Sequence, residues 1–170
     1  MADDEAREEA TRVARRAELM ARAKDSNVND KTLLATDYLN HVNEIVMLLE
    51  LVPDMPESLD DCRAWQPISY AEHFRNSHIH DKDLAIEAYE FAPPQYREAF
   101  DRLMGETNRL IAISIERLDA TLALGDAHAT RDIATRASRN LQDLIGQASA
   151  IIHGDDHVID QEQIDELMRL

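Results

Sequence analysis

The sequence predicts an all-α protein, a helical bundle built on a long antiparallel helical hairpin, with a short C-terminal helix. Glycine and proline are scarce, at 4 and 5 of 170 residues, and a chain rich in alanine, leucine, glutamate and arginine favours helices. Long segments also repeat apolar residues at three- and four-residue spacing, as helices do. Hydrophobic residues make up 44% of the chain, which is enough for one domain with a core of its own.

The first half of the chain predicts two helices followed by a loop. Residues 3–24 carry many charges over a thin apolar stripe, which indicates a solvated helix or arm. Residues 31–52 repeat apolar side chains at helical spacing and end before Pro53, with Asn29 or Asp30 as the cap. Residues 53–68 hold three prolines and several acids, and we expect a loop there, with Trp65 packed against the bundle.

Two short helices should follow. Ser69 is a good N-cap for a helix over residues 70–76, and Asp81 is one for a helix over residues 82–92. Pro93 ends the second of these, and Pro94 suits the first turn of the next helix.

The two longest helices should form the hairpin. They are expected over residues 94–124 and 127–153, and Gly125 and Gly154 are placed to close them. Because few residues join them, they should lie antiparallel. Asp160 and Gln163 predict a capping box for a terminal helix. The expected organisation is a charged N-terminal helix or arm at 1–28, a helical bundle domain at 29–154, and a linker with a C-terminal docking helix at 155–170.

Charge limits the classes of partner. With 34 acidic residues against 18 basic ones, the formal net charge is −16. Such a surface repels nucleic acid and anionic lipid, so we expect neither nucleic-acid binding nor membrane insertion, and a partner with a basic patch fits better. A lone cysteine, Cys62, and an N-terminus without a signal-peptide pattern are typical of a cytoplasmic protein.

A cluster of histidines is the candidate metal site. The stretch "EHFRNSHIHD" contains Glu72, His73, His78, His80 and Asp81, which are suitable ligands for a divalent metal. The cluster spans a break between two short helices and has no ordered ligand spacing, so solvated or capping histidines are the preferred interpretation. No nucleotide-binding loop and no Ser/His/Asp pattern occurs.

The last long helix carries a polar strip beside its apolar stripe. At 100° per residue the apolar side chains share one face, and four polar side chains share an outward one: Arg136, Asn140, Asp143 and Gln147. Gly146 stands between the last two, although glycine inside a helix costs about 0.5–1 kcal/mol relative to alanine. Either the glycine is tolerated, or a partner approaches the helix closely there. The plain alternative for the strip is that Asp143 pairs with Arg139 and Gln147 is solvated.

The segment "LQDLIGQ" resembles the active-site segment of the chemotaxis phosphatase CheZ family, an Asp and a Gln four residues apart in a Phe-Gln-Asp-Leu/Ile-Thr-Gly-Gln context. Leu141 and Ile145 replace the aromatic residue and the threonine of that pattern. The tail "DQEQIDELMRL" is similar to the tethered regulator-docking helix of the same family, and to the regulator-binding peptide of the flagellar switch protein FliM. By itself the tail points to binding of a CheY-like response regulator more than to phosphatase activity.

The resemblance implies roles for particular residues. Gln147 would orient a water molecule in line with the phosphorus of the regulator's aspartyl phosphate, and Asp143 would pair with the regulator's active-site lysine. Ile164, Asp165, Leu167 and Met168 would bind the regulator. The chain would need no cofactor of its own, since the regulator carries the Mg²⁺. The family also dimerises through a four-helix bundle, so a homodimer is expected.

A second hypothesis is a non-enzymatic adaptor or scaffold, and the sequence leaves open whether this chain is an enzyme. In that case the tail docks a partner and the hairpin only presents it. An aromatic cluster of Trp65, Tyr70, Phe74 and Tyr89 would then shape a groove. Replacing Gln147 by alanine would distinguish the two, because an adaptor has no catalytic step to lose.

Overall fold

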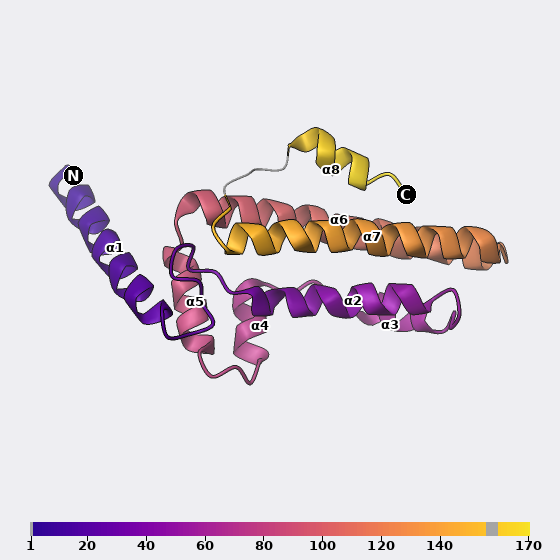
Figure 1. Ribbon diagram of the computed structural model, residues 1–170, viewed down its shortest axis with the longest axis horizontal. Helices are drawn as coiled ribbons and strands as arrows, with labels where there is room; N and C mark the ends of the chain where they lie inside the picture. Colours follow the sequence, from indigo (N-terminus) through magenta and orange to yellow (C-terminus); the bar gives the residue numbers. More distant parts are fainter. Residues whose placement is uncertain (1, 156–159) are drawn as a thin grey trace. The chain divides into compact units, whose positions relative to one another are not determined.

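The computed structural model describes residues 2–155 and 160–170, and every regular element in them is helical (Figure 1). The prediction of an all-α protein is confirmed. The helices are α1 (Ala2–Ala23), a 3-10 turn η1 (Thr36–Tyr38), α2 (Leu39–Leu51), α3 (Ser58–Ala64), α4 (Tyr70–Asn76), α5 (Lys82–Phe91), α6 (Pro94–Ala123), α7 (Ala127–Ile152) and α8 (Gln161–Leu167). Within this described part, no helix combines the length and apolarity needed to cross a membrane.

The chain divides into two compact units. The first gathers residues 1–38, 68–100 and 150–156, and the second gathers residues 39–67, 101–149 and 157–170. The two long helices α6 and α7 each contribute to both.

Aromatic side chains form the core of the first unit. Tyr70 lies at their centre, with its ring centroid 4.6 Å from Tyr89, 4.8 Å from Phe74 and 5.5 Å from Tyr38. The Tyr70 hydroxyl accepts a hydrogen bond from the backbone N–H of Ala35 at 2.8 Å, so its buried polar atom has a partner.

Helix α1 contacts α5 mainly through charged side chains. Arg15 pairs with Glu87 and with Glu18, and the guanidinium of Arg16 donates to the carbonyl of Phe91 at 2.8 Å. Only the end of the helix is buried, at Leu19 and Ala23, so the prediction of a largely solvated helix is confirmed.

The helix expected over residues 31–52 begins only at Leu39; that prediction is wrong for residues 31–35, and residues 36–38 form the 3-10 turn η1. The Asn29 side chain accepts hydrogen bonds from the backbone N–H groups of Lys31 and Thr32, at 2.9 and 3.0 Å. Leu33 then takes a left-handed conformation, with φ of 58°. The buried loop is tied to the end of α7, because the Thr32 hydroxyl donates to the carbonyl of Ile152. Local side-chain bonds and this anchor replace the helical turn.

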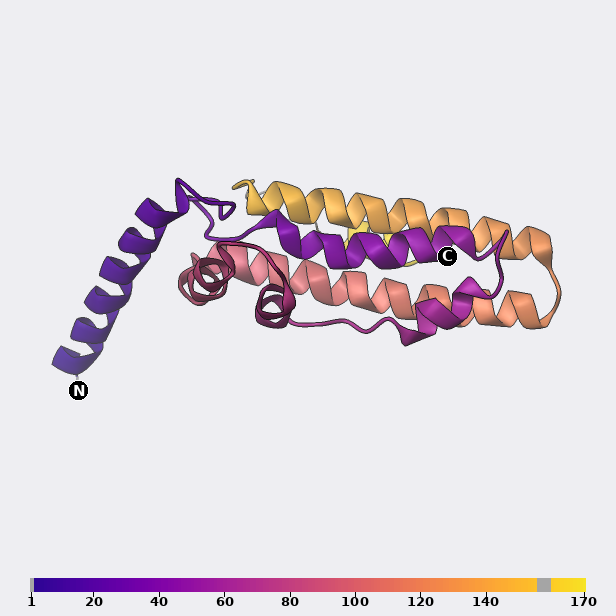
Figure 2. The same cartoon turned by 90° about the horizontal axis from the view of Figure 1, so that it is seen from below.

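The hairpin of α6 and α7 is the frame of the second unit, where residues 101–123 and 127–149 lie side by side (Figure 2). Its register is marked near the turn by the hydroxyl of Thr130, which donates to that of Thr121 at 2.9 Å. Gly125 has φ of 66° and closes α6 as predicted, and Gly154 has φ of 93° after α7. The side chains predicted as the apolar stripe of α7 are all buried: Ile133, Ala137, Leu141, Leu144, Ala148 and Ile151.

Helix α2 packs on this hairpin through both apolar and polar contacts. Its Val42, Ile45 and Leu49 are buried, and at its end Glu50 accepts hydrogen bonds from Ser138 and Gln142 of α7. Asp54, just after the helix, pairs with Arg131 at 2.5 Å. Helix α2 is therefore part of the bundle in the second unit.

The loop predicted over residues 53–68 contains a helix, and this prediction is wrong for α3. Leu59 and Cys62, three residues apart, are buried on one side of α3, and Arg63 pairs with Asp119 of α6. A helix of seven residues with only two buried apolar side chains is too short for a periodic pattern to outweigh the surrounding prolines.

The predicted N-caps form on α4 and α8 but not on α5. Ser69 and Glu72 form a complete capping box on α4, and Asp160 and Gln163 form the predicted one on α8. Helix α5 follows Asp81 as expected, but the Asp81 side chain makes no capping hydrogen bond and lies 3.0 Å from the ring of His80 instead.

Candidate functional site on the hairpin

The polar strip of α7 lies outward, beside the buried stripe that anchors the helix. Asp143 is exposed and Gln147, one turn later, is half-buried. Leu144 and Ala148 follow each of them directly and are fully buried. The packed stripe therefore fixes the rotation of α7 and holds the carboxylate and the amide on one side of a rigid helix.

The Asp143 carboxylate has no hydrogen bond or ion pair with any residue that the structure describes. The alternative pairing of Asp143 with Arg139 does not form, and Arg136 pairs with Asp132 instead, at 2.7 Å. An exposed carboxylate without an intramolecular cation is available to a cationic group of a partner.

Gly146 is exposed, and a Cβ atom added there would meet nothing within 4 Å in the described chain. Its backbone is helical, so no unusual dihedral angle requires glycine either. Neither packing nor conformation inside this chain explains the residue.

The C-terminal tail is the second part of the candidate site, and its predicted partner-binding residues differ in exposure. Ile164 is fully buried, Leu167 and Met168 are half-buried, and Asp165 is exposed. Asp165 accepts a hydrogen bond from the Gln161 amide at 2.8 Å, one turn earlier on α8.

The tail lies on the chain's own hairpin, within the second unit (Figure 1). The Arg102 guanidinium donates to the Gln161 side chain at 2.9 Å, and the Arg117 guanidinium donates to the backbone oxygen of Leu170. From α7, the Asn140 amide donates to the carbonyl of Leu167 at 2.7 Å. The sequence prediction of a tethered docking helix did not include this contact. An apolar side on a short helix suits its own bundle as well as a partner, so the pattern could not separate the two.

Part of the predicted tail lies outside the described residues. These are residues 156–159, which belong to the linker expected from residue 155 onward.

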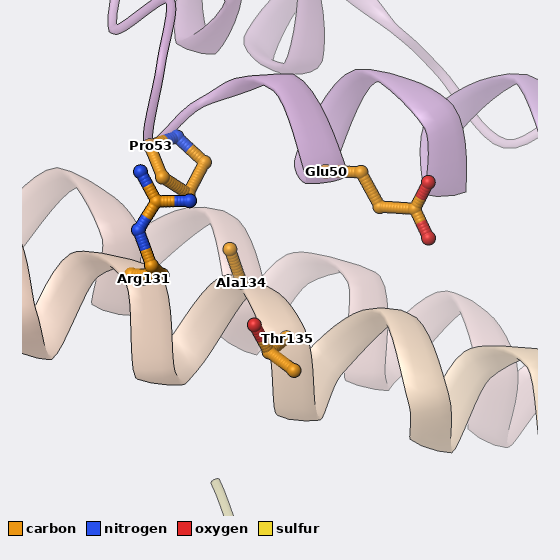
Figure 3. A pocket seen from close by; sticks show the side chains of 5 residues that line it. All are labelled: Glu50, Pro53, Arg131, Ala134 and Thr135. Carbon is orange, nitrogen blue, oxygen red and sulfur yellow. The ribbon is translucent and has the colours of Figure 1, made fainter.

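A small cavity lies between the end of α2 and the first half of α7, lined by Glu50, Pro53, Arg131, Ala134 and Thr135 (Figure 3). Its volume of about 70 Å³ is far below the 300–1,000 Å³ or so of a typical ligand pocket. The Glu50 carboxylate points away from Arg131 in this view, and each is bound elsewhere, Glu50 to Ser138 and Arg131 to Asp54. The cavity is therefore a small gap where α2 packs on α7, and it is too small to be a substrate pocket.

The histidine-rich stretch does not assemble as a metal centre. Within residues 2–155 and 160–170, no three His, Cys, Asp or Glu side chains come together to hold a metal ion. His73 lies among aromatic rings, 5.1 Å from Phe74 and 5.6 Å from Tyr38, whereas the His80 side chain is 99% exposed.

The aromatic cluster proposed to shape a groove is mainly a core, and that expectation is wrong. Tyr70 and Phe74 are buried among the rings of the first unit, with Tyr89 stacked on them. Trp65 belongs to the second unit, where it stacks on His41 at 4.7 Å and donates to the carbonyl of the same residue.

The Cys62 thiol and the Tyr70 hydroxyl are titratable groups that are buried away from the α6–α7 hairpin. Burial raises the pKa of the Cys62 thiol to about 11, and the charge of Asp61 adds to the effect, so the thiolate form is disfavoured. Burial also raises the pKa of Tyr70. Both groups remain neutral at physiological pH and serve the core.

Comparison with known proteins adds no relative: the sequence matches no protein-family model and no curated protein, and the fold matches no solved structure.

Proposed function

We propose that this chain is a cytoplasmic helical signalling protein that binds a CheY-like response regulator and promotes hydrolysis of its aspartyl phosphate. The observation that carries the proposal is the outward pair Asp143 and Gln147, one turn apart on a packed helix, with Gly146 beside them, a glycine that no contact in the described part of the chain requires. The type of reaction, hydrolysis of an aspartyl phosphate, is proposed from the resemblance of this segment and of the tail to the CheZ family.

Gln147 is the proposed catalytic residue. Its amide carries both a donor and an acceptor, so it can hold a water molecule in a fixed orientation. In the proposed step the water oxygen bonds to phosphorus while the bond from phosphorus to the regulator's aspartate oxygen breaks. The aspartate leaves as a carboxylate, and inorganic phosphate keeps the water oxygen together with both protons of the water. Orientation of the water is the whole contribution of this chain, as with the water-positioning glutamine of GTPases.

Asp143 is the proposed positioning residue. A receiver domain holds its phosphoryl group near a lysine, and a carboxylate one helical turn from Gln147 is placed to pair with that cation. The regulator's own Mg²⁺ neutralises the phosphoryl oxygens, so the absence of a cofactor from this chain is part of the proposal.

Gly146 fits the same geometry. A side chain there would project from the exposed side of α7, next to Asp143 and one residue before Gln147, where the regulator backbone would have to approach. Clearance for a partner is the remaining physical reason to accept the cost in helix stability.

The test is the rate at which a phosphorylated CheY-like regulator from the same organism loses its phosphate. We expect wild-type protein to accelerate the loss, and Gln147→Ala to bind the regulator normally but reduce the acceleration by about a hundredfold, the usual effect of removing one polar group at a transition state. Gln142→Ala is the matched control, since Gln142 is an exposed amide on α7 that bonds to Glu50 and Ser138 on another face. Equal activity of the Gln147→Ala and wild-type proteins would exclude the catalytic role.

The non-enzymatic adaptor is the second candidate, and one surface favours it. Met47, Leu51 and Met55 are 59%, 44% and 46% exposed. They follow one another at one-turn intervals, since the backbone N–H of Met55 bonds to the carbonyl of Leu51 beyond the end of α2. Exposed acids, Glu44 and Glu57, lie near each end of this row.

Such a row fits an amphipathic segment with basic flanks, because its acidic neighbours would attract opposite charge. An adaptor of this kind would bind its partner through the row and leave the lifetime of the regulator's phosphate unchanged. Regulator decay that no form of the protein accelerates would leave the adaptor as the function.

A further inference from the structure

We propose that α8 is an intramolecular competitor of the response regulator, which covers the Gln147 face of the hairpin until the regulator captures the tail. This inference rests on the proposed function for the identity of the partner. The contact between tail and hairpin stands on its own observations.

The first observation is that the tail cannot serve two partners at once. Ile164, the apolar centre of the proposed regulator-binding segment, is 0% exposed, and Leu170 is 9% exposed. A regulator that buries Ile164 in its own groove must therefore take α8 away from the hairpin.

The second observation is where the tail lies along the hairpin. Thr121 and Thr130 are opposite each other near the turn. In an antiparallel pair each step back along α6 matches a step forward along α7, so Arg102 lies level with about residue 149 and Arg117 with about residue 134. These arginines hold the two ends of the tail, at Gln161 and Leu170. The tail therefore spans the levels of both Gln147 and Asp143.

The third observation is which face of α7 the tail approaches. Asn140 donates to the carbonyl of Leu167. Gln147 is seven residues from Asn140, and two helical turns of 3.6 residues bring it to within about 20° of the same direction. Asp143 is turned further away, which agrees with its full exposure and the half-burial of Gln147.

Together these contacts make a two-state device. In the docked state, α8 lies on the face that carries the proposed catalytic amide and hides its own Ile164. Capture of the tail by a regulator would open that face and leave the captured regulator tethered beside it, at a high effective concentration. The docked state also lowers the apparent affinity for the regulator by the fraction of molecules in which the tail is undocked.

The test uses the full chain with Arg102→Ala and Arg117→Ala combined, since neither arginine belongs to the proposed catalytic or regulator-binding residues. Arg109→Ala is the matched control, because Arg109 lies on the same helix and, among the described residues, pairs with Glu106 alone. Circular dichroism checks that all forms remain folded. The first measurement needs no regulator: amide hydrogen exchange of residues 164–168 should be faster in the double variant and unchanged in the control.

The second measurement is binding to a CheY-like regulator whose aspartate carries beryllofluoride, a stable mimic of the phosphoryl group. The double variant should bind about threefold more tightly or better, because less of the protein is held in the docked state. Unchanged exchange in the double variant would overturn the docked state. Faster exchange with unchanged or weaker binding would overturn the competition.

Failure of the proposed function gives a different result from failure of this inference. If neither wild type nor the double variant binds any regulator from the organism, both the proposed function and the competition are lost. The exchange data still decide separately whether α8 is held on the hairpin by Arg102 and Arg117.

Discussion

At the scale of single residues, Gly146 allows the stability of the fold and the binding of a partner to be tested separately. A Cβ atom at Gly146 or at Gly105 would meet nothing within 4 Å in the described chain, and both glycines are exposed on long helices. Alanine at either position should raise the free energy of unfolding by about 0.5–1 kcal/mol, because glycine loses more backbone entropy in a helix. Urea denaturation of the two variants measures this.

The same pair of variants tests the candidate site. We expect Gly146→Ala alone to slow regulator dephosphorylation, since only that methyl group would project from α7 next to Asp143. Gly105→Ala serves as the control for the change in stability. If Gly146→Ala proves more stable and fully active, clearance is not the reason for the glycine.

At the scale of one element, the capping box of α4 should contribute measurably to stability. The Ser69 hydroxyl accepts from the backbone N–H of Glu72 at 3.1 Å, and the Glu72 carboxylate accepts from that of Ser69 at 3.0 Å. Ser69→Ala should lower the free energy of unfolding by about 1 kcal/mol, while Ser69→Asp, which keeps an acceptor, should lower it less. Equal stability of the Ser69→Ala and wild-type proteins in urea would contradict this role.

The stability that the α4 cap contributes depends on pH, and the pKa of Glu72 gives the direction. The backbone hydrogen bond from Ser69 lowers the pKa of Glu72 below its ordinary 4.5, and the Ser69 side chain adds to the effect. The unfolded chain therefore binds more protons just below that pH. The contribution of Glu72 is present above pH 4.5 and is lost as the pH falls through the lowered pKa.

At the scale of the whole molecule, charge should control self-association. Each copy carries a formal charge of −16, so two copies repel each other. Between about 0.1 M and about 1 M salt the screening length falls from about 10 Å to about 3 Å. If the homodimer implied by the family resemblance forms, its share should rise with salt, and light scattering should show a mass rising from 19.3 kDa towards twice that value.

Two other salt dependences would be interpreted differently from a mass that rises with salt. A mass of 19.3 kDa at every salt concentration would contradict the expected homodimer. Binding of a basic partner by the Met47, Leu51 and Met55 row should weaken as salt rises, because attraction between opposite charges is then screened. The sign of the salt dependence thus separates self-association from binding of such a partner.

The sequence by itself determined the long helices and most of their ends. In α7 the apolar residues recur over about five turns, so their period fixes both the helix and its buried face, including the outward position of Asp143. Gly125 and the capping boxes act within a few residues of themselves, and such local signals can be recognised without the rest of the chain.

Only the tertiary structure decided where short or ambiguous segments go. Residues 31–35 carry helical spacing, yet the bonds of Asn29 and the anchor of Thr32 on Ile152 impose a loop. Helix α3 forms because Leu59 and Cys62 are buried on one side of it. The apolar side of α8 is visible in the sequence, but whether Ile164 faces a partner or the chain's own hairpin depends on contacts with Arg102, Arg117 and Asn140. These residues lie 27 to 59 positions away from their partners, and no local pattern encodes a contact over that distance.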